Sequence, residues 1–304
     1  MGTVRVGKRT FFERFFKDPF VGIIAFFFLT FFKVLPLDMA SWFGEKIGVG
    51  LGKIAKKKNK IALHNLRKCF PEKTHEEHLK IIDGMWRHYG RLVGELPHKK
   101  ALKKRIEYVG MENLKLAKED GKGGFLCSAH FGNWEIAGIV TAEQDMPLHL
   151  VYRTANNPWI EKLVYQKRKD KGVVLIPKGM AGARMMIELL NKNEHIGMLC
   201  DQKMREGMWV PFFGYPAQTA TAMATMALKM DVPIFPSYAI RLKGARYRCV
   251  IGSPLEYEKT GDREKDILTI MTKINALFEI WIRQNPEQWL WIHHRWPKEE
   301  YKKD

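Results

Sequence analysis

An apolar segment near the N-terminus constrains this chain more than any other feature. Pro19 to Phe32 carries no charge, and after Lys33 the apolar run continues to Leu37. About 20 apolar helical residues cross the hydrocarbon core of a bilayer, and this run reaches that length if the Lys33 side chain extends to the membrane surface. A cleaved signal peptide, a buried core helix and a membrane anchor are the three interpretations.

We favour the membrane anchor, either spanning the bilayer or lying in its interface. The region before the segment is long for a signal peptide, and no clear small-residue cleavage site follows it. A core helix with so many adjacent phenylalanines would be hydrophobic on every face. We therefore expect residues 1–55 to form a membrane-anchor region and residues 56–304 to form an α/β domain.

The basic residues are concentrated around this segment. The 304-residue chain has a formal net charge of +18, of which +14 falls in residues 1–105. A nucleic-acid enzyme would more typically carry its basic side chains around the active site, so we expect no nucleic-acid partner. The flank after the segment is the more basic one, which places the rest of the chain in the cytoplasm by the positive-inside rule. The Lys53–Lys60 run either faces anionic lipid head groups or forms a solvated helix face.

The rest of the sequence predicts helices alternating with strands. Residues 57–95 are typical of two helices separated at Pro71, the second starting in a capping box at Thr74–Glu77. Short apolar runs then predict strands at Gly124–Ala129, Leu148–Tyr152, Val173–Ile176, Ile196–Cys200, Val232–Ala239 and Tyr247–Ile251. Helices are expected at Glu112–Lys118, Trp159–Asp170, Gly182–Asn191, Thr219–Met230 and Arg263–Gln284. This alternation indicates an α/β fold with a mixed, largely parallel sheet flanked by helices, behind an N-terminal hydrophobic membrane-anchor helix.

Two local patterns have ordinary structural explanations. Gly48–Gly52 is glycine-rich, but no strand precedes it, so packing or a loop explains it better than a nucleotide site. His75 and His78 are expected to be exposed helical histidines, because no third metal ligand is in view. We expect neither a metal nor an organic cofactor.

The residues best suited to catalysis follow the first long apolar strand. His130 stands at its carboxyl edge, where open α/β sheets place ligands and catalytic groups. A turn at Gly132 leads into a helix, and Glu135 in its first turn can fold back toward His130 to hold the imidazole tautomer. The N-terminus of that helix also offers N–H groups to a developing oxyanion. The alternative is a strand-end histidine beside an ordinary helix-start glutamate.

No serine or cysteine nucleophile is adjacent to this pair. A histidine with a carboxylate would then activate a hydroxyl group of the substrate, which suggests direct acyl transfer to an alcohol. Activation of water in a hydrolase remains open.

Four motifs in order give the chain a family resemblance. His130–Glu135 reads H-F-G-N-W-E and resembles the H-x4-[DE] signature of the lysophospholipid acyltransferase superfamily, in the version of the late acyltransferases of bacterial lipid A biosynthesis. The other matches, over about residues 20–297, are Y-R-x-x-N-N-P at Tyr152–Pro158, D-Q followed by V-P-F-F-G-x-x-A-x-T at Asp201–Thr219, and P-E-Q-W-L-W-I-H-H-R at Pro286–Arg295.

The resemblance implies transfer of a fatty acyl chain from a thioester, on acyl carrier protein or coenzyme A, to a hydroxyl of a lipid A precursor at the cytoplasmic (inner) membrane. It implies His130 as general base and Glu135 as its partner. Arg153, Arg184 and Asp201 are the candidates for substrate positioning, and Phe213 and Gly214 for lining the site. The alternatives are a solvated helix residue for Arg184, a structural role for Asp201 and core packing for the aromatic pair Phe212 and Phe213. Nine of the fifteen methionines lie between Met180 and Met230, where core packing is favoured over an acyl-chain tunnel. Another glycolipid or lysophospholipid acceptor, and a thioesterase or lipid hydrolase activity, are the alternatives.

Three departures from the family pattern leave head-group specificity open. Lys203 stands where many members have a second acid, His294 where arginine is usual, and Trp289 where tyrosine is common. None of them changes His130 or Glu135.

Overall fold

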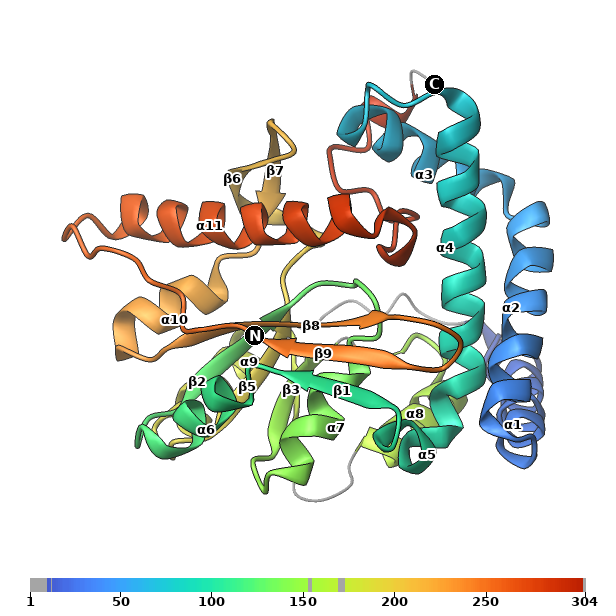
Figure 1. Ribbon diagram of the computed structural model, residues 1–304, viewed down its shortest axis with the longest axis horizontal. Helices are drawn as coiled ribbons and strands as arrows, with labels where there is room; N and C mark the ends of the chain where they lie inside the picture. The colour runs from blue at the N-terminus through green and yellow to red at the C-terminus, as the bar shows by residue number, and fades with distance from the viewer. Residues whose placement is uncertain (1–9, 12, 153–154, 169–172, 303–304) are drawn as a thin grey trace.

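The computed structural model describes residues 10–11, 13–152, 155–168 and 173–302 (Figure 1). Its centre is a seven-stranded sheet in the order β1-β9-β8-β2-β5-β3-β4. Only β8 and β9 pair antiparallel, and the other neighbours pair parallel. The predicted mixed, largely parallel sheet is therefore confirmed. The strands are β1 (Ile106–Val109), β2 (Gly124–Ser128), β3 (Leu148–Tyr152), β4 (Leu175–Pro177), β5 (His195–Leu199), β8 (Ile234–Arg241) and β9 (Tyr247–Ile251).

A separate two-stranded hairpin stands outside this sheet, formed by β6 (Lys203–Phe212) and β7 (Tyr215–Thr219). Its turn places both Phe213 (φ 51°) and Gly214 (φ 77°) in the left-handed region. Asparagine, aspartate and glycine are the usual residues in such turns. The hairpin was not predicted because Phe-Gly is not a recognised signal for it. The short strand β1 at the sheet edge was not predicted either.

The helices cover both faces of the sheet, with α11 on one side and α7 on the other (Figure 1). One apolar core involves α9, α10 and α11, and a second lies under α6 and α7. The longer helices are α1 (Asp18–Val34), α2 (Leu37–Ile54), α3 (Lys56–Cys69), α4 (His75–Glu95), α6 (Met111–Glu119), α7 (Glu135–Glu143), α8 (Pro158–Arg168), α9 (Met180–Leu190), α10 (Ala222–Met230) and α11 (Arg263–Gln284). Short helical segments are η1 (Glu13–Lys17), η2 (Leu96–His98), α5 (Lys99–Lys103), η4 (Pro286–Gln288) and η5 (Glu300–Lys302).

The N-terminal apolar segment forms an exposed helix at one edge of the molecule (Figure 1). Phe15–Val34 is long and apolar enough to cross a membrane, at about 1.5 Å per residue, and only 11% of it is buried. Its exposed apolar side chains continue onto α2 at Trp42, Leu51 and Ile54. The expected apolar helix is present and is not a buried core helix.

Helix α2 packs against α4 with almost no side chain between the two backbones. A Cβ atom on Gly44 would lie 2.3 Å from the carbonyl oxygen of Gly90, and one on Gly48 would lie 2.2 Å from that of Trp86. A Cβ on Gly94 would meet the carbonyl oxygen of Ala40 at 2.2 Å. The packing explanation for the glycines is therefore confirmed at Gly48, and we call this α2–α4 contact the glycine contact.

Helix α4 begins where the sequence predicted. Thr74 accepts a hydrogen bond from the Glu77 N–H, and the Glu77 side chain accepts one from the Thr74 N–H, which completes the capping box. His78 was expected to be exposed but is buried, because the start of α4 packs back against the end of α3; its Nε2 lies 3.0 Å from the carbonyl oxygen of Phe70. No group of three or more metal-ligating side chains occurs among the described residues.

Candidate functional site

His130 and Asp201 meet at the carboxyl edge of the sheet. Nδ1 of His130 lies 2.8 Å from Oδ1 of Asp201, and the His130 backbone N–H donates to Oδ2 at 3.0 Å. Asp201 is 2% exposed, whereas the His130 side chain is 21% exposed and can reach a substrate. The carboxylate therefore fixes both the backbone and the ring of the histidine.

Strand register places these two residues side by side. Strands β2 and β5 are parallel neighbours with Ser128 paired to Leu199. The next backbone bond continues the ladder, because the Cys200 N–H donates to the Ser128 carbonyl. His130 and Asp201 each lie two residues beyond that last pair, and so they face one another.

The environment keeps Asp201 ionised. Burial alone would raise the pKa of Asp201, but the His130 charge and hydrogen bonds from His130 and Trp289 together lower that pKa to about 2. Trp289 donates its indole N–H to Oδ2 at 2.8 Å. Tryptophan at this position, a departure from the family pattern, thus supplies a hydrogen bond to the buried carboxylate.

The turn after His130 is held by helix α4 and by the segment around η4. The Tyr89 hydroxyl donates to the His130 carbonyl at 2.8 Å, and His88 Nε2 lies 3.1 Å from the Gly132 carbonyl. The Leu290 N–H also donates to the His130 carbonyl, at 3.1 Å, and the Gly132 N–H donates to that of Gln288, at 2.8 Å. These bonds satisfy the backbone of the turn that follows His130.

The second ring nitrogen of His130 contacts Gln202, a residue that lines a polar cavity. The amide nitrogen of Gln202 lies 3.3 Å from Nε2, and the His293 ring centroid is 6.0 Å from that of His130. Gln202 and His293 both line a cavity of about 380 Å³. With Nδ1–H donated to Asp201, Nε2 carries the lone pair, which accepts from the Gln202 amide and is the position on the ring that can take a proton from a hydroxyl.

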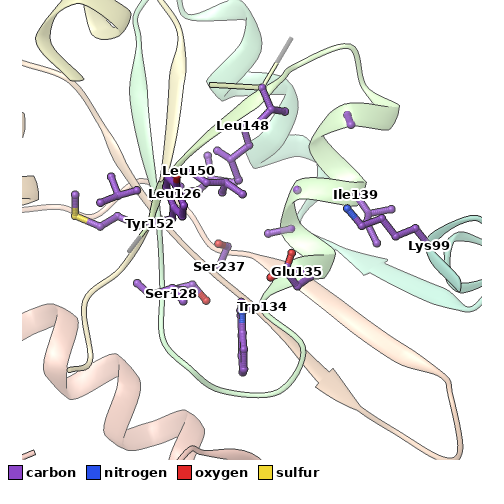
Figure 2. Close-up of a pocket in the computed structure, with 18 of the residues that line it drawn as sticks. Lys99, Leu126, Ser128, Trp134, Glu135, Ile139, Leu148, Leu150, Tyr152 and Ser237 are labelled. Carbon is purple, nitrogen blue, oxygen red and sulfur yellow. The ribbon is translucent and has the colours of Figure 1, made fainter. Parts of the chain in front are cut away.

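An apolar cavity of about 330 Å³ lies between α7 and the strands β2, β3 and β5 (Figure 2). Ser128, Trp134 and Glu135 line it, and the Trp134 ring is 5.3 Å from that of His130. Aliphatic side chains from the strands and from α7 make up most of the remaining wall, including Leu126, Leu148, Leu150 and Ile139. The cavity is suited to a hydrocarbon chain.

Glu135, the expected partner of His130, begins helix α7 and lines this apolar cavity. Figure 2 shows its carboxylate beside Ser237, between the helix and the strands. The Nδ1 position that an orienting carboxylate would occupy is taken by Asp201. The role of Glu135 stays a prediction.

The helix N-terminus is less available than expected. The Glu135 N–H donates to the Asn133 side chain at 3.2 Å, and the Ile136 N–H donates to the Asn133 carbonyl at 3.1 Å. These two donors are therefore already used within the turn and are not presented to an oxyanion.

The other predicted site residues do not converge on His130 in the same way. Arg153 lies outside the described residues. Arg184 is exposed on α9, and Phe213 and Gly214 form the β6–β7 turn, where the Phe213 N–H donates to Glu279 at 2.7 Å. Among the described residues, neither cavity is lined by Arg184, Phe213 or Gly214. Met198 lines the apolar cavity, and Met186, Met223 and Met226 belong to the core.

Two of the ordered motifs contact each other behind the site. The buried Arg295 donates to the Thr219 hydroxyl at 2.7 Å, and the Phe212 and Trp289 rings are 5.7 Å apart. Trp289 in turn holds Asp201. These contacts therefore connect both motifs to the His130–Asp201 pair through Trp289.

Sequence reasoning did not find the supporting roles of His88, Tyr89 and Trp289, nor the contact of Gln202 with His130. The D-Q pair directly after an apolar strand was the available signal for Asp201 and Gln202. That signal becomes specific only once β2 and β5 are known to be neighbours. Nothing local in α4 marks His88 or Tyr89.

Together, the fold and the site define an α/β protein with a histidine that Asp201 orients and that contacts the walls of an apolar and a polar cavity through Trp134 and Gln202. The family model described as bacterial lipid A biosynthesis acyltransferase matches residues 13–298. The chain belongs to this family and is an acyltransferase.

Relatives of known name are similar in sequence to this protein over most of its length. A lipid A biosynthesis acyltransferase of Haemophilus influenzae is 27% identical over 95% of this chain and 92% of its own length. The lipid A biosynthesis palmitoleoyltransferase of Escherichia coli is 26% identical over 86% of each chain. The lauroyltransferase of the same pathway and organism is 26% identical over 82% of this chain and 84% of its own length.

Proposed function

We propose that the protein transfers a fatty acyl chain from acyl carrier protein to a hydroxyl of a lipid A precursor at the cytoplasmic face of the inner membrane. One observation carries the proposal: His130, oriented by Asp201, contacts Trp134, which lines an apolar cavity, and Gln202, which lines a polar one. The first cavity fits an acyl chain, and the second leaves room for a polar acceptor. The names of the relatives support lipid A as the acceptor.

The reaction follows from the two nitrogens of His130. Nε2 takes the proton of the acceptor hydroxyl, whose oxygen attacks the thioester carbonyl and forms the new C–O bond. The C–S bond then breaks, and the imidazolium returns the proton to the departing thiolate. Asp201 stabilises the imidazolium between these steps, because its ionised carboxylate contacts Nδ1.

The N-terminal helices support a membrane location. The exposed apolar side chains of α1 and α2 would otherwise face water. Exposed lysines lie in the last turn of α2 and the first turns of α3, at Lys53, Lys56, Lys57, Lys58 and Lys60. Basic residues next to an apolar helix attract anionic lipids. Lys100 and Lys103 on α5 line the apolar cavity, and they suit an acidic carrier protein as donor.

The test uses the full chain in membranes, with acyl carrier protein thioester and a lipid A precursor, and product mass is recorded. Wild-type protein is expected to add one acyl chain, and His130→Ala to reduce the rate by about 10²–10⁴-fold. A normal rate for His130→Ala would overturn the mechanism. Release of free fatty acid without any acylated acceptor would identify a thioesterase instead.

The variant Glu135→Gln distinguishes the contribution of the Glu135 carboxylate to turnover from that of Asp201. We keep Glu135 in the proposal as a second catalytic carboxylate, at the junction of the apolar cavity and the His130 turn. A loss comparable to that of His130→Ala supports this role. Wild-type turnover in Glu135→Gln would leave Asp201 as the sole partner of His130.

A further inference from the structure

Helix α4 ends in a carboxylate that is completely buried. Glu95 is 0% exposed, and its two oxygens accept from the two terminal nitrogens of Arg241, at 2.6 and 3.1 Å. Arg241 is the last residue of β8, and its side chain is buried as well. Ser41 of α2 and Tyr247 of β9 donate further hydrogen bonds to Glu95. A bidentate ion pair with these additional partners holds the guanidinium in one orientation.

The same guanidinium contacts a histidine of α4. Nε of Arg241 donates to Nδ1 of His88 at 3.3 Å. Because burial and the Arg241 charge lower the pKa of His88 to about 3, the ring is neutral and carries one proton. The nitrogen that accepts from Arg241 cannot carry this proton, so it lies on Nε2, which donates to the Gly132 carbonyl at 3.1 Å. Arg241 therefore selects the His88 tautomer that holds Gly132.

The main chain of Arg241 is connected to the other backbone group of Gly132. The Arg241 N–H donates to Oε1 of Gln288 at 2.8 Å, and the Gln288 side-chain amide donates to the Arg241 carbonyl at 3.0 Å. The Gln288 carbonyl accepts from the Gly132 N–H, also at 2.8 Å. Gln288 belongs to the motif that begins at Pro286. Both backbone groups of Gly132 are thus held by residues that Arg241 contacts.

Gly132 is the residue at which the chain turns from His130 toward α7. Its φ of 54° lies in the left-handed region, which glycine adopts at little cost. A Cβ atom here would lie 1.9 Å from the carbonyl oxygen of Ala239, on the same strand as Arg241. His130 precedes Gly132 by two residues, so a shift of this turn changes the position of the imidazole.

We propose that Arg241 is a positioning residue for His130, and that Glu95 keeps Arg241 in place. It acts on the turn through both backbone groups of Gly132. Neither of the two cavities is lined by Arg241 or Glu95. The inference rests on the proposed function, in which Nε2 of His130 takes the acceptor proton. A displacement of about 1 Å in a reacting group costs on the order of 10²-fold in rate.

The principal variant is Arg241→Lys. Lysine keeps a positive charge beside the buried Glu95 carboxylate, but its single ammonium replaces the planar fork that also contacts His88. Full-length wild type and variants would be assayed in detergent, below the melting temperature of each protein, so that loss of folded protein does not lower the rate. The variants kcat and KM would be determined for donor and acceptor.

The matched control is Asp266→Asn. Asp266 is also a buried carboxylate, and it accepts from the Thr260 hydroxyl at 2.7 Å. It lies in the first turn of α11, at the opposite end of that helix from η4. This variant should lower the melting temperature without affecting the turn that follows His130.

We expect Arg241→Lys to lower kcat by about 10–10²-fold and to leave both KM values unchanged. The control should keep wild-type kcat. A pair of variants at His88 tests the connection independently: His88→Gln can place an amide N–H near the position of Nε2–H and should retain most of kcat, whereas His88→Leu should lose it. Wild-type kcat in Arg241→Lys, a change in KM alone, or equal kcat in the two His88 variants would overturn the inference.

Hydrogen–deuterium exchange separates this inference from the proposed function. Peptides covering residues 129–135 report the opening of the turn and require no turnover. Exchange there should be faster in Arg241→Lys and His88→Leu than in wild type, and unchanged in Asp266→Asn. Faster exchange in these variants, with no acyl transfer by wild type, would contradict the proposed function alone. Unchanged exchange in Arg241→Lys would overturn the inference even if acyl transfer by wild type is normal.

Discussion

Nδ1 of His130 lies 2.8 Å from Oδ1 of Asp201, although 71 residues separate them in sequence. The two are neighbours because β2 and β5 pair in parallel and each residue follows its strand by the same number of positions. The carboxylate therefore belongs to the sheet and not to the turn that carries the histidine. Asp201 follows β5 whereas Glu135 begins α7, so substituting one carboxylate tests its role without altering the other.

Asp201→Asn is expected to lower kcat for acyl transfer by about 10²–10⁴-fold. The asparagine amide can donate to Nδ1, which moves the ring proton to Nε2 and removes the lone pair that accepts the hydroxyl proton. Single-turnover rates with saturating donor and acceptor would show the loss, with circular dichroism as a check on folding. Trp289→Phe, which removes only the indole hydrogen bond to Asp201, should cost less. Wild-type kcat in Asp201→Asn would contradict the orienting role.

His88 should make stability sensitive to acid. Burial first, and then the Arg241 charge, lower its pKa from an ordinary 6.5 to about 3. Between these values the unfolded chain binds a proton that the folded one does not, so the stability present above pH 6.5 is lost as the pH falls. The free energy of unfolding should decrease by about 2 kcal/mol more in wild type than in His88→Gln between pH 7 and pH 5. Denaturant unfolding in detergent measures this, and the exposed His75→Gln should behave as wild type. Equal slopes for wild type and His88→Gln would refute the prediction.

Gly138 offers a way to shorten the apolar cavity. It lies on α7, lines that cavity, and has no atom within 4 Å of the position that a Cβ would occupy. Gly138→Leu should therefore fill space without displacing the helix and shift preference toward shorter acyl donors. Competition between donors of different chain length, read by product mass, would reveal the shift. Gly50→Leu, which has equally open surroundings on α2, serves as the control. An unchanged chain-length profile in Gly138→Leu would place the acyl chain elsewhere.

The glycine contact should tolerate no side chain. In Gly90→Ala the new Cβ would lie 2.2 Å from the Gly44 carbonyl oxygen, so one helix must move. We expect a loss of about 1–3 kcal/mol in stability, visible as a lower melting temperature, and a lower kcat because α4 carries Tyr89 and His88. Gly50→Ala should leave both quantities close to wild type. A melting temperature unchanged by Gly90→Ala would show that the helices can separate freely.

Much of this molecule follows from local sequence rules. The spacing of apolar residues predicted most of the strands and helices, and the capping box at Thr74 predicted the start of α4. Local rules could not show that β5 lies beside β2. Asp201 was therefore expected to position the substrate, and Glu135 was expected to be the partner of His130. They also missed the β6–β7 hairpin, whose turn holds Phe213 in a conformation that phenylalanine rarely adopts. What escaped prediction is long-range pairing and the contacts that follow from it.

The glycine contact has a consequence for how the enzyme would meet its substrates. With backbone against backbone, α2 and α4 have little room to slide, and α4 is hydrogen-bonded to the turn that carries His130. If the exposed face of α1 and α2 lies in the bilayer, this rigid connection fixes the distance between the lipid surface and Nε2 of His130. Acceptors would then be selected by how far their hydroxyl stands out of the membrane, in addition to their chemistry.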